Sequence, residues 1–235
     1  MVQKPSPSNC HILQQRDAPA PLTAEHFDLD YWTDKPGYAE LGGGRGATVR
    51  ISLQGQDAIL RHYYRGGLVG KFLTDQYLWL GKSMSRPWRE WKILERAYRA
   101  GLPVPKPVGA CACRRGWWYR AAIITGYLPD TETLAARLEK TELAAKAWYR
   151  LGALIKQLQA QGIRHPDLTV TNILIDTQER FYLIDFDNAR IKNRLDDWQW
   201  GPLARLQRSL DKFNRESRPD YPGDDWQALM DGYQS

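Results

Sequence analysis

The stretch from His165 to Asp176 reads HPDLTVTNILID, a polar loop that runs directly into an apolar strand. Ahead of it, residues 142–161 place apolar side chains at helical spacing and are followed by Gly162, which predicts a long helix and its end. After it, the turn TQER separates two short strands expected at residues 172–176 and 181–185. The chain must therefore hold this polar loop between a helix and a strand pair.

Three side chains of this framework carry the oxygen atoms that phosphoryl transfer needs. Asp167 lies five residues before Asn172, and Asp185 follows Asn172 by thirteen residues at the end of the second strand. Two strands that emerge beside one loop bring such side chains together. A carboxylate that orients or deprotonates an attacking hydroxyl suits Asp167, and oxygen ligands for a magnesium ion on nucleotide phosphates suit Asn172 and Asp185.

The net charge of +6 is concentrated in one segment. Residues 61–120 hold 13 Lys or Arg against 3 Asp or Glu, whereas the segments before and after each hold two more acids than bases. Such a block favours an anionic partner, which can be nucleic acid, a phosphorylated substrate or an anionic membrane. A solvated basic face is the alternative.

The composition indicates a folded chain in a reducing compartment, with its cysteines as free thiols. No apolar run approaches the roughly 18 residues of a spanning helix, and the first residues lack the pattern of a signal peptide, so we expect a location in the cytoplasm. The three cysteines, Cys10, Cys111 and Cys113, suit neither a disulfide framework nor a four-ligand zinc site.

The remaining patterns predict an α+β protein whose first part is built on strands and whose second part is mostly helical. Residues 1–30 are rich in Pro, Ser and Gln and are expected to be an irregular lead-in. We expect a single domain over residues 1–235, with a first part at 31–124 and a second part at 125–235. Further strands are predicted at 48–53, 57–64 and 117–125, and further helices at 86–99 and 196–213.

The loop HPDLTVTN followed by IDFD resembles the catalytic loop and metal-binding motif of protein-kinase-like enzymes. The resemblance implies a bilobal fold, with a small antiparallel sheet and one main helix in the N-terminal lobe and a reduced, mostly helical C-terminal lobe. It implies ATP and Mg²⁺ as cofactors, with Asp167 as catalytic residue, Asn172 and Asp185 as metal ligands, and His165 as the structural histidine of the loop.

Two candidate phosphate-binding features precede this loop in the order that the resemblance requires. The glycine loop GGGRG contains Gly43, Gly44, Arg45 and Gly46, and residues without side chains let backbone N–H groups approach an anion. A flexible turn is the alternative for this loop. Arg61 ends the strand AILR, where kinases place the lysine that binds the α- and β-phosphates, with Lys71 or Lys82 as possible substitutes.

Glu90 is expected on the inner face of the helix at residues 86–99. Apolar residues follow it at helical spacing, and an acid that points inward needs a cationic partner. The kinase-like fold offers an ion pair between Glu90 and Arg61, which positions the phosphate-binding cation. The alternative is an exposed pair between Glu90 and Arg86, four residues earlier.

The chain also departs from a protein kinase in ways that bear on its substrate. Asp187 stands where the glycine of the metal-binding motif is usual, and it either assists the metal or stiffens the turn. Only 48 residues follow Asp187, and no activation segment ending in A-P-E is visible. A protein substrate is therefore not expected.

The stretch LRHYYRGGLVGK, together with GGGRG, GLPVPKPVGA and RLQRSLDKF, is similar to the Kdo kinases of Gram-negative bacteria, in the lipopolysaccharide kinase group. The similarity runs from about residue 40 to residue 213 and covers most of the chain. It implies ATP-dependent phosphorylation of 3-deoxy-D-manno-octulosonic acid (Kdo) at its 4-hydroxyl on a lipid A precursor, Kdo-lipid IVA. It also implies a peripheral protein on the cytoplasmic side of the inner membrane.

The basic segment is compatible with such a substrate, because the sugar carboxylate, the lipid phosphates and the bilayer surface are all anionic. Candidate residues for substrate or membrane contact are Arg65, Lys71, Lys82 and Arg86. Aromatic residues interleave with them and can stack on sugar or lie at headgroup depth, with ordinary core packing as the alternative. These aromatic residues are Tyr63, Tyr64, Phe72, Tyr77, Trp79 and Trp88.

Three competing functions remain open at this stage. An aminoglycoside-type phosphotransferase shares the set of Asp167, Asn172 and Asp185, but its cationic substrates would be repelled by the basic segment. A nucleotide-binding scaffold without catalysis is suggested by Arg61 and Asp187, since both depart from the kinase pattern. A nucleic-acid binder would use the same basic segment, but no known motif supports it, so nucleic acid is not an expected partner.

Overall fold

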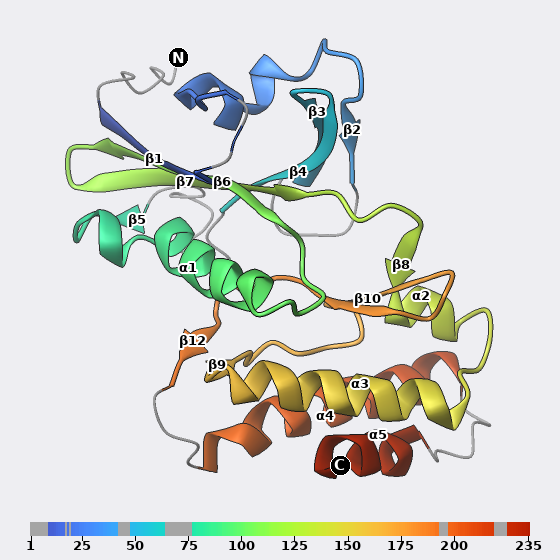
Figure 1. The fold of residues 1–235 in the computed structure, drawn as a ribbon. Coiled ribbons are helices and arrows are strands. Elements are labelled where there is room, and N and C mark those ends of the chain that lie inside the picture. Colours follow the sequence, from blue (N-terminus) through green and yellow to red (C-terminus); the bar gives the residue numbers. More distant parts are fainter. Residues whose placement is uncertain are drawn as a thin grey trace. The chain divides into compact units, whose positions relative to one another are not determined.

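The computed structural model describes residues 9–16, 18, 20–41, 48–63, 77–192, 197–218 and 225–235. The chain divides into two compact units: unit 1 comprises residues 1–92 and 106–127, and unit 2 comprises residues 93–105 and 128–235. Both units combine strands with helical segments, so the expected α+β class is confirmed (Figure 1). Among the helices of the described residues, none is both long enough and apolar enough to cross a bilayer.

Unit 1 is built on one antiparallel sheet of seven strands. Along the main path the order is β1, β6, β7, β4, β3 and β2, and β5 pairs separately with β7. The expected strand at residues 48–53 is confirmed as β3, whereas β6 was missed because its proline-rich start indicates a loop. The bounds are β1 Cys10–Gln14, β2 Ala39–Glu40, β3 Thr48–Leu53, β4 Gln56–His62, β5 Tyr77–Leu78, β6 Pro107–Arg115 and β7 Trp118–Gly126.

The two faces of this sheet are covered by different segments. Successive side chains of a strand point to opposite faces, so Leu60 and Arg61 of β4 face opposite ways. One face, which includes Leu60, packs under Leu22, Phe27 and Trp32 from the N-terminal segment. The other face packs under the first half of helix α1 (Arg86–Arg99). Arg61 is therefore directed to the α1 side of the sheet.

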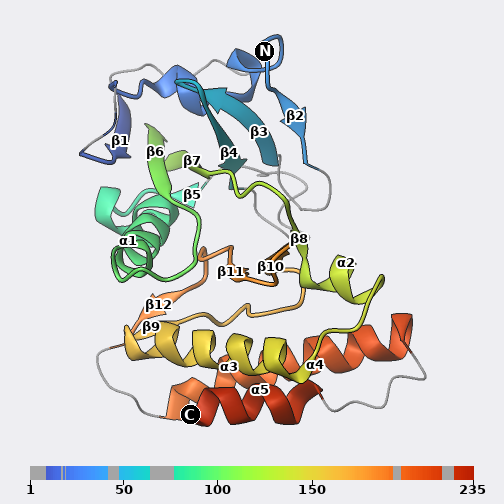
Figure 2. The same cartoon turned by 45° about the vertical axis from the view of Figure 1, so that its right-hand side comes forward.

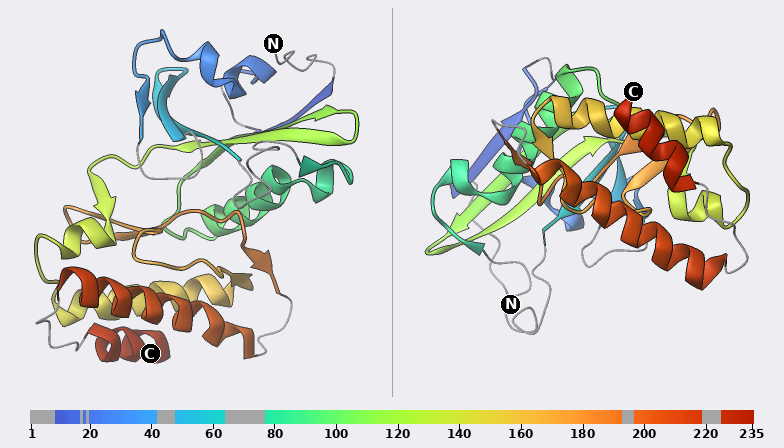
Figure 3. Two further views of the ribbon diagram at one scale, coloured as in Figure 1. Left: turned by 180° about the vertical axis from the view of Figure 1, so that it is seen from behind. Right: turned by 90° about the horizontal axis from the view of Figure 1, so that it is seen from below.

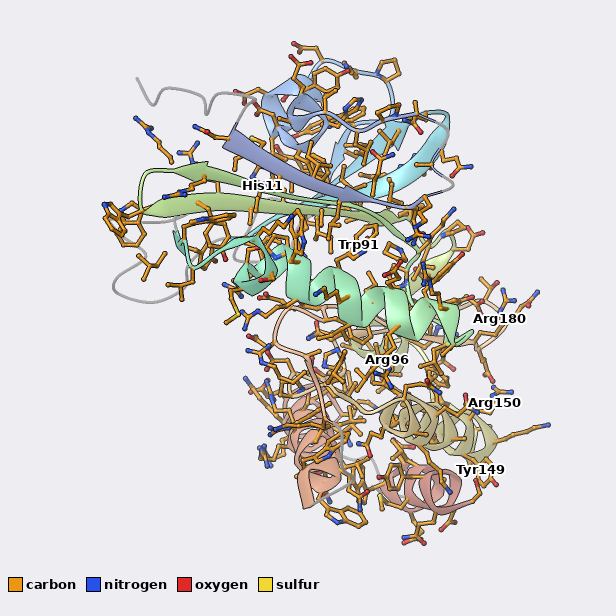
Figure 4. The ribbon with its side chains drawn as sticks, turned by 60° about the vertical axis from the view of Figure 1, so that its left-hand side comes forward. His11, Trp91, Arg96, Tyr149, Arg150 and Arg180 are labelled. Carbon is orange, nitrogen blue, oxygen red and sulfur yellow. A yellow bond between two sulfur atoms is a disulfide. The ribbon has the colours of Figure 1, made fainter. Side chains whose placement is uncertain are left out.

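The bounds of α1 agree with the expected helix at 86–99. Pro87 occupies its first turn, and Gly101, just past its end, has the positive φ of 74° that a glycine tolerates best. Trp91 points from α1 toward the sheet (Figure 4) and is 3% exposed. The division between the two units falls inside this helix, after Lys92.

The N-terminal segment is more ordered than its composition indicates. Within the expected lead-in at residues 1–30, β1 pairs with β6, and the 3-10 turn at Ala24–Phe27 buries Phe27. Cys10 and Cys113 lie opposite each other in the two strands and form a disulfide, which the cysteine spacing did not indicate. A strand whose partner lies about a hundred residues away leaves no local signal in the sequence.

The described residues of unit 2 form two small sheets and the helices α2 to α5, besides the second half of α1 (Figure 2). The three-stranded sheet has the order β11, β10, β8, and the two-stranded sheet pairs β9 with β12. Its core joins side chains from the second half of α1, from α3 and from α4 to those of the central strand β10. The strands are β8 Thr131–Thr133, β9 Ile163–Arg164, β10 Ile173–Asp176, β11 Phe181–Leu183 and β12 Arg190–Ile191; the helices are α2 Leu134–Leu138, α3 Ala145–Ala160, α4 Trp200–Ser217 and α5 Asp225–Gln234.

Helices α3 and α5 approach each other unusually closely (Figure 3). A Cβ atom built on Gly152 of α3 would lie 1.9 Å from the backbone oxygen of Leu229, and one built on Gly232 of α5 would lie 1.9 Å from that of Tyr149. Side chains at these two positions would force the backbones apart. Helix α5 was not expected from the sequence, and its place depends on this pair of glycines.

Candidate functional site

The polar loop is located where the sequence predicts, between a long helix and a strand pair of unit 2. His165 directly follows β9, and Asn172 directly precedes β10. Leu168 and Val170 of the loop are buried, and the backbone of Val170 accepts a hydrogen bond from Ala135 N and donates one to Ser209 Oγ of α4. These contacts fix the loop through its apolar side chains and its backbone. The polar side chains of the loop are not needed for this anchoring.

Asn172 connects the parts of the loop that carry Asp167 and Asp185. Its Nδ2 donates to the backbone oxygen of Asp167 over 2.9 Å. Its own backbone oxygen accepts from Ile184 N at 3.1 Å, one residue before Asp185. The three predicted residues thus come together through Asn172. Because Nδ2 is engaged with the backbone, the amide oxygen of Asn172 is the atom that this side chain offers to a ligand.

Asp185 has a backbone conformation that few residues adopt. Its φ is 63°, in the left-handed region, where residues other than glycine are uncommon and tend to occur at functional sites. The neighbouring Phe186 is 1% exposed, whereas Asp185 itself is exposed. The left-handed turn therefore lets a buried phenylalanine follow an outward-facing carboxylate.

His165 braces the loop against the strand that leads to Asp185. Its Nε2 donates to the backbone oxygen of Ile184 over 3.0 Å, and its ring packs against that of Phe186. Burial lowers the pKa of His165, and the nearby carboxylates of Asp185 and Asp167 only partly oppose this effect. The imidazole is therefore neutral near pH 7 and acts as a hydrogen-bond donor, which is the structural role implied by the family resemblance.

Asn188 is a residue of this site that the sequence reasoning missed. Its Nδ2 donates to Oδ2 of Asp167 over 2.8 Å. Asn188 is exposed and lies three residues after Asp185 in a turn, so neither burial nor periodicity marks it in the sequence. The only available sequence signal was its closeness to the IDFD motif. The bond orients the Asp167 carboxylate through one of its two oxygens.

Asp187 differs from Asp185 in its surroundings. It is 9% exposed, and the turn that contains it, residues 186–189, is closed by a backbone hydrogen bond of 2.9 Å from Ala189 N to Phe186 O. Its burial within a closed turn favours the alternative in which Asp187 stiffens the turn.

Asn172 and Asp185 fit a hard divalent cation by the chemistry of their donor atoms. Magnesium prefers oxygen ligands, and these residues supply one amide oxygen and one exposed carboxylate. Their positions are set by the main chain, through the hydrogen bond between Ile184 and Asn172. The metal-ligand assignment stays a prediction, supported by this fit.

Unit 1 contains the ion pair predicted between Arg61 and Glu90. The Nη2 atom of Arg61 lies 2.5 Å from Oε1 of Glu90, and Glu90 is 3% exposed. The second carboxylate oxygen of Glu90 accepts a hydrogen bond from the hydroxyl of Tyr63. Burial raises the pKa of Tyr63 well above its usual range, so this hydroxyl stays protonated and remains a donor. The inner face of α1 thereby fixes the direction of Arg61.

The alternative partner of Glu90 is engaged with other groups. Arg86 donates from Nη1 to the hydroxyl of Tyr77 over 2.7 Å, and its guanidinium lies over the Tyr77 ring at 4.9 Å. Tyr63, Tyr77 and Trp88 are all buried in the core under α1, which supports the packing alternative for these aromatic residues. Lys82 is exposed. The predicted residues Gly43, Gly44, Arg45, Gly46, Arg65 and Lys71, and the aromatic residues Tyr64 and Phe72, lie outside the described residues.

The joined Asp167, Asn172 and Asp185 lie in an α+β protein, the fold class that the resemblance to kinase-like enzymes implies. A comparison with solved structures supports that fold class. The chain matches a structure described as WaaP in complex with acyl carrier protein, with a TM-score of 0.56 and 17% identity, over 84% of this chain and 77% of that chain.

The chain belongs to the lipopolysaccharide kinase (Kdo/WaaP) family, whose model matches residues 30–233. It is thus a phosphotransferase that acts on a hydroxyl group. The 3-deoxy-D-manno-octulosonic acid kinase of Mannheimia succiniciproducens is 37% identical over 234 residues, which cover 97% of each chain. The protein of the same name from Vibrio vulnificus strain YJ016 is 35% identical over 209 residues, which cover 89% of this chain and 88% of the relative. The family resemblance in the sequence is confirmed.

Proposed function

We propose that this protein transfers the γ-phosphate of ATP to the 4-hydroxyl of Kdo on Kdo-lipid IVA during lipopolysaccharide synthesis. The observation that carries the reaction type is the joined set of Asp167, Asn172 and Asp185 in unit 2. The choice of Kdo rests on relatives named as Kdo kinases that are 35% and 37% identical over at least 88% of their length.

Asp167 has the chemistry to prepare the sugar hydroxyl for attack. Asn188 orients the carboxylate through Oδ2, and Asn172 fixes the main chain of Asp167 through its backbone oxygen. A fixed carboxylate can accept the hydroxyl proton as the oxygen attacks phosphorus, a contribution typically worth about 10²–10⁴ in rate. Asn172 and Asp185 are the residues that would hold Mg²⁺, which, when bound with ATP, neutralises charge on the phosphates.

Arg61 is the residue of unit 1 that has the chemistry to bind nucleotide phosphates. It ends β4, and its Glu90 partner directs the guanidinium. Arginine stays charged at all relevant pH values and presents a planar set of donors that matches phosphate oxygens. This chemistry supports Arg61 in the place that lysine takes in other kinases.

The proposal is tested by incubating the purified protein with [γ-³²P]ATP, Mg²⁺ and either Kdo-lipid IVA or a deacylated, water-soluble Kdo acceptor. Labelled phosphate on the sugar, located at the 4-hydroxyl by fragmentation in a mass spectrometer, supports the assignment. Labelled phosphate on another hydroxyl of the sugar would contradict the proposed 4-position and leave the proposed reaction in place. An absence of labelled acceptor, with ATP and Mg²⁺ bound, would overturn the proposed reaction in favour of a nucleotide-binding scaffold.

An aminoglycoside acceptor is the control for substrate class. The basic segment at residues 61–120 should favour the anionic Kdo acceptor over a polycationic one. Transfer to an aminoglycoside at a rate equal to that of the Kdo acceptor would contradict the proposed choice of substrate.

We also propose that the protein works as a peripheral protein on the cytoplasmic side of the inner membrane, where a Kdo-bearing lipid would be presented to it. Opposite charges on the basic segment and on anionic lipids support this location. Fractionation of cells should recover the protein with inner membranes at low salt and release it at high salt. A protein that stays wholly in the soluble fraction at low salt would argue against this location.

A further inference from the structure

The four most exposed large apolar side chains in the described part of the chain lie in one region of unit 1. Trp117 is 78% exposed, Leu80 68%, Met84 56% and Leu78 48%. Five further large apolar residues in the described chain are exposed to a smaller degree and lie elsewhere: Leu41, Tyr98, Tyr149, Ile191 and Trp200. Large apolar groups left in water in this number usually mark a contact surface.

Strand pairing brings the segments of Leu78 and Trp117 together, and Leu80 and Met84 follow Leu78 within six residues. Leu78 of β5 pairs with Trp118 at the start of β7, and Trp79 N donates to Trp117 O over 2.8 Å. The tight turn between β6 and β7 is held by Arg114 Nε, which donates to Gly116 O over 2.8 Å. In Figure 1, β5 and this turn lie at the same end of the sheet. Met84 ends the 3-10 turn at Lys82–Met84, four residues after Leu80.

The exposed Leu78 alternates along its strand with a buried aromatic ring. Its side chain therefore lies on the face of the strand that points away from the core. Tyr77 and Tyr119, which alternate with Leu78 and Trp118 along the same strands, belong to the core under α1. Trp79 stacks on His11 of β1, with ring centroids 5.3 Å apart. Two of the aromatic residues proposed from the sequence for headgroup contact, Tyr77 and Trp79, therefore support this region from within, and a different set of side chains is exposed.

The charge of the region has one sign. Residues 78–86 and 114–120 contain five cations and no acid. Lys82, Arg114 and Arg115 of this set are exposed. We define the hairpin-tip surface by seven residues: Leu78, Leu80, Lys82, Met84, Arg114, Arg115 and Trp117.

We propose that the hairpin-tip surface docks on an anionic phospholipid bilayer, with its apolar side chains at headgroup depth and its cations against lipid phosphates. Tryptophan prefers the membrane interface, and each nearby lysine or arginine adds attraction to anionic lipid. A hairpin tip that carries Trp117, with further exposed apolar residues and cations beside it, fits a bilayer, which accepts both kinds of group at once. The inference deepens the membrane part of the proposed function by naming the surface and its lipid partner.

The test uses flotation of the purified protein with vesicles of phosphatidylethanolamine and phosphatidylglycerol in equal parts, compared with vesicles of phosphatidylcholine alone. The wild-type protein should float with the anionic vesicles and much less with the neutral ones. Because surface charge is screened over about 8 Å at physiological ionic strength, binding should weaken as salt rises. Equal binding to both kinds of vesicle would overturn the charge component of the inference.

Two sets of substitutions separate the contributions. A cation variant with Lys82→Ser, Arg114→Ser and Arg115→Ser should bind anionic vesicles on the order of 100-fold more weakly. An apolar variant with Leu80→Ser, Met84→Ser and Trp117→Ser should lose at least about tenfold. Full retention of binding by either variant overturns the assignment of this surface.

Matched controls carry the same kinds of substitution elsewhere. Tyr98→Ser with Tyr149→Ser removes two other exposed rings, Tyr149 on α3 being visible in Figure 4, and Lys92→Ser with Lys106→Ser and Lys146→Ser removes three other exposed cations. Both controls should bind nearly as well as the wild type. An equal loss in the controls would mean unspecific adhesion and would overturn the inference.

Transfer to the water-soluble Kdo acceptor separates this inference from the proposed reaction. The apolar variant should phosphorylate that acceptor at the wild-type rate, because its substituted side chains are exposed and lie outside the catalytic loop. Sedimentation of the same variant also tests the alternative occupant, a second copy of the chain. Self-association that the apolar variant abolishes, without vesicle binding by the wild type, would replace the bilayer by a dimer contact.

Discussion

Glu90 in unit 1 and Asp185 in unit 2 are both acids with a predicted role toward a nucleotide, yet their surroundings are opposite. Glu90 is 3% exposed and gives its two oxygens to Arg61 and Tyr63. Asp185 is exposed and stands on a left-handed backbone. The contrast separates an acid that holds the protein together through buried contacts from an acid whose side chain is accessible to a ligand. Substitutions at the two kinds of acid should therefore fail in different ways.

The largest expected effect is on turnover, at the catalytic loop. Asp167→Ala should lower kcat by about 10²–10⁴, because the sugar hydroxyl loses its proton acceptor. The free energy of unfolding should change by less than about 0.5 kcal/mol, since Asp167 is only half-buried. Phosphate transfer and thermal unfolding measure the two quantities. Asp34→Ala, an exposed acid of unit 1, is the matched control, and near wild-type turnover in Asp167→Ala would remove the assigned role.

The opposite outcome is expected at the buried acid. Glu90→Ala should lower the free energy of unfolding by about 2–4 kcal/mol, because Arg61 and the hydroxyl of Tyr63 lose their partner inside the protein. Asp185→Asn keeps the shape of the side chain and should leave stability within about 0.5 kcal/mol of wild type. Urea unfolding of the two variants measures both free energies of unfolding. Similar losses for the two would break the contrast between the acids.

A smaller effect on turnover is expected from Asn188. Asn188→Ala removes the donor that orients Asp167 and should lower kcat about tenfold, with the KM for ATP little changed. Asn188→Asp has nearly the same shape but sets a second carboxylate against Asp167, so it should lose at least as much activity as the alanine variant. If the variants are unfolded to an extent that explains the whole fall in kcat, Asn188 has a structural role only.

The smallest effect concerns pH and the histidine of the loop. Burial lowers the pKa of His165 in the folded protein, whereas the unfolded chain has the usual value of about 6.5. Below about pH 6.5 the unfolded chain therefore binds a proton that the folded protein does not. The free energy of unfolding should fall as pH drops through this range, by up to about 1.4 kcal/mol per pH unit, and this group should cause no change above it.

His165→Gln should make the pH dependence shallower, as measured by urea unfolding between about pH 5 and 7. His26 of unit 1 is the comparison, because half-burial lowers its pKa as well. A His26→Gln variant should reduce the slope less than His165→Gln does. An unchanged slope in His165→Gln would show that this histidine is not buried in the neutral form.

The parts of the site that the sequence could predict are those with a local reason to be recognised. Asp167, Asn172 and Asp185 follow one another within nineteen residues; Asp167 lies in the polar loop, and Asn172 and Asp185 lie at the ends of predicted strands. Glu90 was identified from an inward position on a helix, and the ion pair to Arg61 is present. Asn188 could not be found in this way. Its hydrogen bond to Asp167 depends on the turn after Asp185, and the sequence does not show that Asp185 has a left-handed backbone conformation.

The fold was predictable to the same extent and for the same reason. Helix α1 and strand β3 have the bounds that periodicity and capping residues indicate. Strand β1 was missed because its partner β6 lies about a hundred residues later, and β6 was hidden by prolines. Helix α5 depends on glycines that allow backbone contact, and glycine in a helix normally counts against one.

The packing of α5 against α3 also sets the order in which the chain can acquire its structure during synthesis. All residues of unit 1 have been made once Tyr127 is added, and domains generally fold as units as they emerge. Unit 2 needs α5, which is made a hundred residues later, to cover Gly152 of α3. The nascent protein therefore passes through a stage in which the sheet that presents Arg61 can be complete while the core that supports the catalytic loop is still open to solvent.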